Sequence, residues 1–155
     1  MSDLKNSPKL ATRLLAAGLI LIGTCTAPAA VCYVDVNSAN PTPPYTSWAT
    51  AATNIQDAID AAVAGDEIVV TNGIYTTGGR GASGEILPTR VLAVRPLTVR
   101  SVNGPQFTII DGGQSNRCVY LTNGASLSGF TLTNGHTYLS GGGVWCRPRI
   151  NRRIS

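Results

Sequence analysis

The clearest hydrophobic pattern lies between residues 53 and 75, where a helical period gives way to a strand period. Apolar side chains recur at the spacing of one helix face, at Ile55, Ala58, Ile59, Ala62 and Val63. The polar residues between them, which this pattern predicts to face away from the core, are Gln56, Asp57 and Asp60. The segment is therefore predicted to be a short amphipathic helix.

Both ends of this helix carry local signals. Thr53 and Gln56 fit a capping box, and Gly65 is well placed just after the last helical turn. The β-branched run over residues 66–71 then predicts a strand, and Asn72-Gly73 predicts a turn. The chain thus passes directly from a helix into a strand.

Short strands with turns between them account for most of the remaining chain. A strand is predicted over residues 33–36 and a proline-containing loop over residues 37–47. Further strands are predicted over residues 91–94, 97–102, 107–110, 118–121 and 127–132. Leu127 and Phe130 are out of phase, which predicts a corner at Gly129. Four Asn-Gly pairs also suit antiparallel hairpins, but short strands that meet at corners favour a coiled chain.

The motifs along residues 33–146 resemble those of a known family. They are Ala-Gly-Asp-Glu-Ile-Val-Val, Gly-Ile-Tyr, Leu-Thr-Val-Arg-Ser-Val-Asn-Gly, Thr-Ile-Ile-Asp-Gly and Gly-Phe-Thr-Leu-Thr-Asn-Gly. They resemble the opening of right-handed parallel β-helix proteins, the pectin-lyase-like secreted bacterial repeat proteins. This resemblance implies an all-β solenoid whose short N-terminal capping α-helix covers the first coil. In such a fold, successive coils stack and bury a continuous core.

Length and terminal composition set the expected extent of the coils. Residues 31–146 suffice for a cap and three or four coils of roughly 20 to 30 residues each. Residues 141–146 are interpreted as the start of another coil, whereas residues 147–155 contain four arginines and no strand alternation. This aberrant basic tail indicates the truncated or out-of-frame end of a longer protein. The alternative is a basic tail that binds an anionic surface.

The first thirty residues have the three-part pattern of a secretory signal peptide. Lys5, Lys9 and Arg13 precede an apolar run over residues 14–23, and a small-residue segment follows. Cleavage is predicted near residues 29–30, and the protein is expected to be secreted or at the cell surface, without membrane contact after cleavage. An uncleaved anchor is disfavoured because the apolar run is shorter than the roughly 20 residues of a span. Acylation of Cys25 is disfavoured by the size of the preceding Thr24.

Charge is unevenly distributed along the chain. The formal net charge is +4, but residues 31–146 hold five arginines against seven acids. The positive excess therefore lies in the leader and the tail, and the body is slightly acidic. This distribution disfavours nucleic-acid binding.

The number of cysteines is more informative than their spacing. Cys32, Cys118 and Cys146 would remain after cleavage, an odd number in an exported chain. A disulfide between Cys118 and Cys146 is the favoured pairing, and the alternative is that the cysteines are small buried core residues. No clustered Cys/His spacing predicts a metal site, and no cofactor is predicted.

Residues that could carry function are few. Tyr45, Trp48 and Trp145 are candidates for carbohydrate contact, although Tyr45 and Trp48 could instead pack the helix onto the first coil. The glycine-rich loop over residues 76–89, which bears Arg80 and Glu85, is a candidate recognition surface.

No catalytic constellation is apparent in the sequence. His136 is the only histidine, no Gly-x-Ser-x-Gly elbow occurs, and Asp111 suits a turn. Asp66 and Glu67 are adjacent, so they would point to opposite faces of a strand. The expected function is adhesion or contact with extracellular polysaccharide or a cell-surface glycan, without catalysis. The alternative, implied by the resemblance, is the N-terminal part of a polysaccharide lyase, pectinesterase or glycosidase that lacks its catalytic coils.

Overall fold

The computed structural model describes residues 28–81, 87–138 and 140–146. The described part consists mostly of strands, with one α-helix, α1 (Ile55–Ala61), and one 3-10 turn, η1 (Trp48–Thr50). Nearly all of the predicted signal peptide, the whole basic tail and residues 82–86 of the glycine-rich loop, including Glu85, lie outside the described residues.

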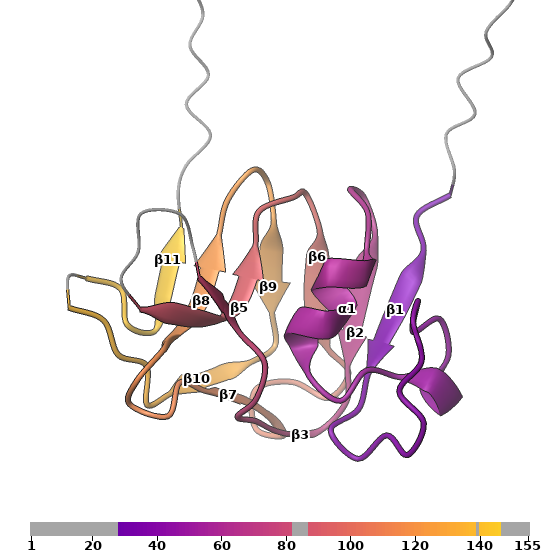
Figure 1. The fold of residues 1–155 in the computed structure, drawn as a ribbon, viewed down its shortest axis with the longest axis horizontal. Coiled ribbons are helices and arrows are strands. Elements are labelled where there is room, and N and C mark those ends of the chain that lie inside the picture. The colour runs from indigo at the N-terminus through magenta and orange to yellow at the C-terminus, as the bar shows by residue number, and fades with distance from the viewer. Residues whose placement is uncertain (1–27, 82–86, 139, 147–155) are drawn as a thin grey trace, which may run out of the picture.

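The strands form three sheets (Figure 1). The first sheet has the order β1 (Val31–Val34), β2 (Glu67–Val70), β6 (Thr98–Ser101) and β9 (Ser126–Ser128). The second contains β3 (Gly73–Tyr75), β7 (Thr108–Asp111) and β10 (Thr131–Thr133). The third contains β4 (Arg80–Gly81), β5 (Pro88–Ala93), β8 (Arg117–Leu121) and β11 (Val144–Cys146). All strand pairings are parallel except that of β4 with β5.

The chain visits the three sheets repeatedly in the same order. Its three passages, here called rounds, are β2-β3-β5, β6-β7-β8 and β9-β10-β11. Strands of successive rounds pair side by side, for example through Ile68 with Val99 and Val99 with Leu127. An array of antiparallel hairpins is thereby excluded for these strands. The two-residue strand β4 was not predicted from the sequence.

The core lies between the three sheets, because each strand turns alternate side chains inward. Cys32, Ile68 and Val99 form one inward row across the first sheet, and all three are buried. Tyr75 and Ile110 pair across the second sheet, and Val91 and Val119 across the third. Complete burial of such side chains contributes about 1.5–3 kcal/mol each to folding.

Glycines allow the chain to turn between sheets. Gly129 separates β9 from β10 with a φ of +80°, which confirms the predicted corner there. Gly112 is needed for a different reason. A Cβ atom on it would lie 2.5 Å from the carbonyl oxygen of Asn116 and 2.6 Å from that of Asn134. The backbones of the second and third rounds meet at this glycine.

The predicted helix is present, but its limits and cap differ from the sequence prediction. It begins at Ile55 and ends at Ala61, and Asn54 rather than Thr53 is the N-cap. The Asn54 side chain accepts a hydrogen bond from the Asp57 N–H at 3.0 Å and donates one to the Asp57 carboxylate at 2.7 Å. Val63 lies beyond the helix and is 62% exposed, so its assignment to the buried stripe was wrong.

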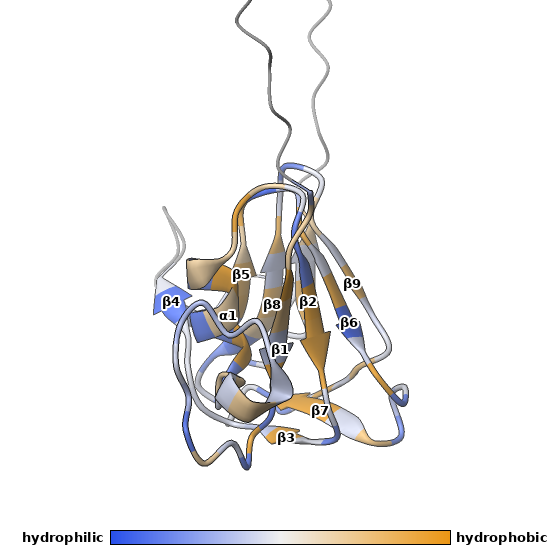
Figure 2. Cartoon of the chain, turned by 90° about the vertical axis from the view of Figure 1, so that its right-hand side faces the viewer, coloured by the Kyte–Doolittle hydropathy of each residue, from blue (hydrophilic) through white to orange (hydrophobic). Residues whose placement is uncertain are grey.

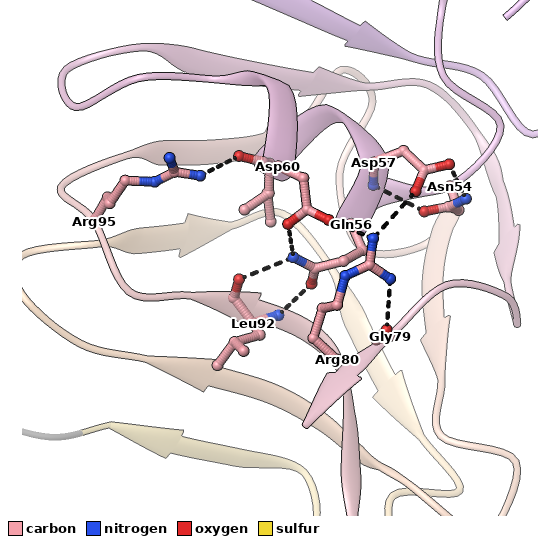
Figure 3. Close-up of polar contacts among 9 residues, drawn as sticks. Asn54, Gln56, Asp57, Asp60, Gly79, Arg80, Leu92 and Arg95 are labelled. Carbon is pink, nitrogen blue, oxygen red and sulfur yellow. Dashed lines mark hydrogen bonds and ion pairs between the residues drawn. The ribbon is translucent and has the colours of Figure 1, made fainter. Parts of the chain in front are cut away.

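Gln56 also departs from the prediction, because it is 1% exposed and faces the core side of the helix. Its side-chain amide accepts from the Leu92 N–H at 2.7 Å and donates to the Leu92 carbonyl at 3.2 Å (Figure 3). A buried glutamine is tolerated here because the backbone of β5 satisfies both of its polar atoms. Gln56 thus fastens α1 to the third sheet.

Two arginines complete the attachment of α1, which packs against β1, β2 and β5. Arg95 donates to the carbonyl of Ile59 at 2.8 Å, near the helix C-terminus, where a cation is favourable. Arg80, on β4, pairs with Asp60 and lies 3.9 Å from the Asp57 carboxylate (Figure 3). These contacts come from segments on either side of the undescribed residues 82–86.

Arginines also bind the loops between the second and third sheets. Arg90 donates to the carbonyls of Gly78, Asp111 and Gly112, at 2.9, 2.9 and 3.4 Å respectively. Arg117, one round later, donates to the carbonyls of Gly141 and Ser140 at 3.0 and 3.3 Å. Each arginine therefore satisfies backbone oxygens that the strands leave unpaired.

Candidate functional site

The outer face of the first sheet combines an aromatic pair with polar side chains. Strand register places two rows across it, Val31-Glu67-Thr98-Ser126 and Tyr33-Val69-Arg100-Ser128. Neighbouring strands lie about 4.8 Å apart, so each row spans about 14 Å. Figure 2, coloured by hydropathy, shows the change from the apolar β2 to the hydrophilic segment of β6. We call these two rows, together with Trp48, the outer face.

The aromatic pair lies at the β1 edge of this face. The rings of Tyr33 and Trp48 are 4.5 Å apart between centroids and inclined at 54°. Trp48 is 45% exposed at the start of η1, and Tyr33 supports one side of its indole ring. Backbone hydrogen bonds from Tyr33 N–H to Tyr45 O and from Ala52 N–H to Tyr33 O hold the two segments together. The indole is therefore exposed to solvent, while these contacts fix its position at the edge of the sheet.

The charged groups of the outer face neutralise one another. Arg100 Nε contacts the carboxylate of Glu67 on the adjacent strand, with both side chains partly exposed. Val69, between Tyr33 and Arg100 in the row, is only 4% exposed although it lies outside the core cluster. The hydroxyls of Ser126 and Thr98 lie 3.4 Å apart and continue the face toward β9. The face therefore offers hydroxyl donors and acceptors with no net charge.

The other two aromatic candidates are engaged elsewhere. Tyr45 is 8% exposed and belongs to the core cluster, so it packs the molecule together and is not accessible to a sugar. Trp145 is half-buried and stacks on Tyr120, at 4.6 Å between centroids and 16° between planes. The guanidinium of Arg117 lies 6.0 Å from the Trp145 ring. Of the three predicted contact residues, Trp48 alone belongs to the outer face.

Two of the described carboxylates, Asp66 and Asp111, accept hydrogen bonds from backbone N–H groups. Asp66, the residue before β2, accepts from Ala30 N–H and from Val63 N–H, each at 2.8 Å. Asp111 accepts from Gly113 N–H at 2.7 Å, as predicted for a turn residue. Within the described ranges, no three His, Cys, Asp or Glu side chains are grouped as metal ligands.

The predicted disulfide between Cys118 and Cys146 is not formed. Both residues are free thiols, Cys118 buried and Cys146 exposed. Cys146 pairs in register with Leu121, three residues beyond Cys118, so the strand geometry separates the two sulfurs. Cys118 Sγ instead donates to the Thr133 carbonyl at 3.2 Å. The alternative interpretation, a small buried core residue, describes Cys118 and also Cys32.

These buried thiols should make stability fall at alkaline pH. Burial is the main cause that raises the pKa of Cys118 above its ordinary value of 9.0, so the unfolded chain ionises first as pH rises. This contribution to stability is complete below about pH 9 and is lost above it. Under reducing conditions, the melting temperature should decline less steeply between about pH 8 and about pH 10 in Cys118→Ala than in the wild type.

The matched control is Cys146→Ala, which removes an exposed thiol. Its melting temperature should follow the wild-type pH dependence. Equal slopes for the wild type and Cys118→Ala would show that the buried thiol is not the titrating group.

The remaining sequence candidates are surface features. His136 is exposed, and its ring meets that of Tyr138 edge to face at 5.5 Å between centroids. Arg80, in the predicted recognition loop, is paired with acids of α1. The part of that loop which the structure describes therefore anchors the helix.

Comparisons with protein families, with curated proteins and with solved structures found no match. In the part of the chain that is described, no helix has the length and apolarity needed to cross a membrane. The functional assignment therefore depends on the outer face itself.

Sequence reasoning missed most residues of the outer face. Thr98 and Arg100 alternate with buried Val99, and Ser126 and Ser128 alternate with Leu127. The outward direction of these four polar side chains could therefore be inferred from the sequence. Their proximity to Tyr33 could not be inferred, because it depends on the register between neighbouring strands. Residues that pair on these strands are 28 to 36 positions apart in the sequence.

Proposed function

We propose that the outer face binds an extended, neutral polysaccharide outside the cell, and that the chain acts in binding rather than catalysis. The observation that carries this proposal is the exposed indole of Trp48, supported by Tyr33 at one end of two polar rows. An aromatic face suits the C–H groups of a pyranose ring, because the negative ring face attracts their positive hydrogens. Side-chain hydroxyls can then bond the sugar hydroxyls.

The neutral character of the ligand follows from the charges on the face. Arg100 and Glu67 are paired, so the face has no net charge that would favour a charged sugar over a neutral one. A neutral chain can cross the pair and leave it intact. The row length of about 14 Å suits a linear segment of a few sugar rings rather than a single ring.

The architecture that we propose for this role is a right-handed parallel β-helix with α1 as its N-terminal cap. It is supported by the parallel pairing of all strands except β4 and by three rounds that visit the sheets in one order. Right-handed connection is the general rule between parallel strands. The sequence pattern of residues 1–30 supports export, which would place the face where polysaccharides occur.

Substitution of Trp48 by alanine should weaken polysaccharide binding. We expect about a tenfold or greater loss of affinity, the size typical of an aromatic side chain that dominates a binding surface. Isothermal titration or affinity electrophoresis with soluble neutral polysaccharides, such as glucomannan, xyloglucan and arabinoxylan, measures this loss. The melting temperature of the variant should stay near that of the wild type, since the indole is half exposed.

Phe107→Ala provides a matched control. Phe107 is 53% exposed and precedes β7 in the second sheet, away from the outer face. This variant should bind with wild-type affinity. Equal losses in both variants, or unchanged binding in Trp48→Ala, would place the contact elsewhere. Absence of binding to every polysaccharide tested would refute the proposed function.

A further inference from the structure

Four Asn-Gly pairs occur at corners of the chain, at Asn72, Asn103, Asn123 and Asn134. In such a pair the glycine nitrogen can lose its proton and attack the side-chain carbonyl carbon of the asparagine. The new N–C bond closes a succinimide ring and ammonia leaves. Water then opens the ring at either carbonyl, giving aspartate or isoaspartate. The reaction needs only water, and the missing glycine Cβ leaves the nitrogen accessible.

Two structural conditions control this reaction in a folded chain. The glycine N–H must be free of a hydrogen bond, and the local backbone must be able to rotate. Gly73 N–H donates to the Phe107 carbonyl at 2.9 Å, and Gly104 N–H donates to Ser101 Oγ at 2.9 Å. The first condition therefore protects Asn72 and Asn103.

The second condition protects Asn134. A Cβ atom on Gly135 would lie 2.1 Å from the Gly142 oxygen and 2.9 Å from Cys118 Sγ, so the backbone of the following loop lies directly against this glycine. Rotation into the cyclisation geometry would displace the adjoining backbone.

The remaining pair meets both conditions. Asn123 and Gly124 are exposed, and Gly124 N–H has no hydrogen-bond partner among the described residues. Among the described residues, a Cβ atom on Gly124 would meet only Pro96 Cβ, at 3.7 Å. From these differences we propose that Asn123 is the site of spontaneous deamidation in the folded protein.

The modification would remove a contact that joins two rounds. Asn123 Nδ2 donates to the Val94 carbonyl at 2.9 Å, and this nitrogen is the one that leaves as ammonia. The product carboxylate faces the same carbonyl without a proton to donate. An isoaspartate also adds a methylene to the main chain just before β9, which carries Ser126 and Ser128 of the outer face.

Peptide mapping by mass spectrometry tests this proposal on the purified full chain, incubated at mildly alkaline pH and sampled over time. The four pairs serve as internal controls for one another. Deamidation of Asn123 should be about fivefold faster than that of Asn72 or Asn103, the factor expected for one protecting hydrogen bond. In urea the deamidation rate of Asn123 should no longer exceed the rates of the other three asparagines, because all four corners are then unfolded.

Several results would overturn the proposal. They are deamidation of Asn72, Asn103 or Asn134 at the rate of Asn123 in folded protein, the same ranking in urea as in buffer, and no deamidation of Asn123 in folded protein. The variant Asn123→Asp reproduces the aspartate product and should melt at a lower temperature than the wild type. Asn123→Gln retains an amide and should show no conversion at this position.

Discussion

Replacement of Ile59 by aspartate should unfold the described part of the chain. Ile59 is buried beneath α1, in the core cluster shared by the helix and the first sheet. The variant loses the burial of a large aliphatic side chain and must either bury a carboxylate or lift the helix away. We expect a loss of roughly 4 kcal/mol or more, which is comparable to the total stability of many small domains. Thermal melting followed by circular dichroism measures it.

Val63→Asp is the control for this prediction. Both residues were placed on one apolar stripe by sequence periodicity, yet Val63 is exposed beyond the end of the helix. Its replacement should cost no more than about 1 kcal/mol, because the new carboxylate stays in water even though Asp66 is nearby. Similar melting of the two variants would mean that α1 does not present Ile59 to the core.

Gly112→Ala should destabilise the chain almost as strongly, for a steric reason. The added methyl group would lie 2.5 Å from the Asn116 oxygen, 2.6 Å from the Asn134 oxygen and 2.8 Å from Gly135 Cα. All three are backbone atoms, so no side-chain rotation relieves the clash. Separation of the second and third rounds at this corner should cost about 3 kcal/mol. Denaturant titration would measure the loss as a lower midpoint.

Gly143→Ala is the matched control, because no atom of another described segment lies within 4 Å of the corresponding Cβ position. Its free energy of unfolding should stay within about 0.5 kcal/mol of the wild-type value, so its midpoint should be nearly unchanged. A wild-type midpoint for Gly112→Ala would show that the corner is more open than the structure describes.

Local patterns predicted most elements of this fold. The helical stripe gave the position of α1, and β-branched runs gave β2, β6 and β7, because these signals depend on residues close in sequence. The corner at Gly129 was predicted from a change of phase. Gln56 was misassigned because the partner that makes its burial favourable, the backbone of Leu92, lies 36 residues away.

Register was the information that local patterns lacked. Ile68 and Val99 are 31 residues apart and Val99 and Leu127 are 28 apart, whereas Ile74 and Ile109 are 35 apart and Ile109 and Thr131 are 22 apart. Loops of unequal length therefore separate equivalent strands, and no fixed repeat places Tyr33 and Arg100 in one row across the sheet. The candidate site could be predicted only through Trp48, whose residue type alone suggests sugar contact. Its polar rows required the three-dimensional pairing.

The arginines that bind the corner carbonyls have a consequence for how the chain unfolds. Arg90 bonds Gly78 in its own round and Asp111 and Gly112 in the next, while Arg117 extends from the second round to the loop before β11. In the β-helix that we propose, the rounds would behave as a one-dimensional chain with nearest-neighbour coupling, and these contacts would raise the coupling relative to the stability of each unit. Strong coupling suppresses states in which one unit is ordered and its neighbour is not. The three rounds should therefore be lost in a single cooperative transition instead of peeling away one at a time.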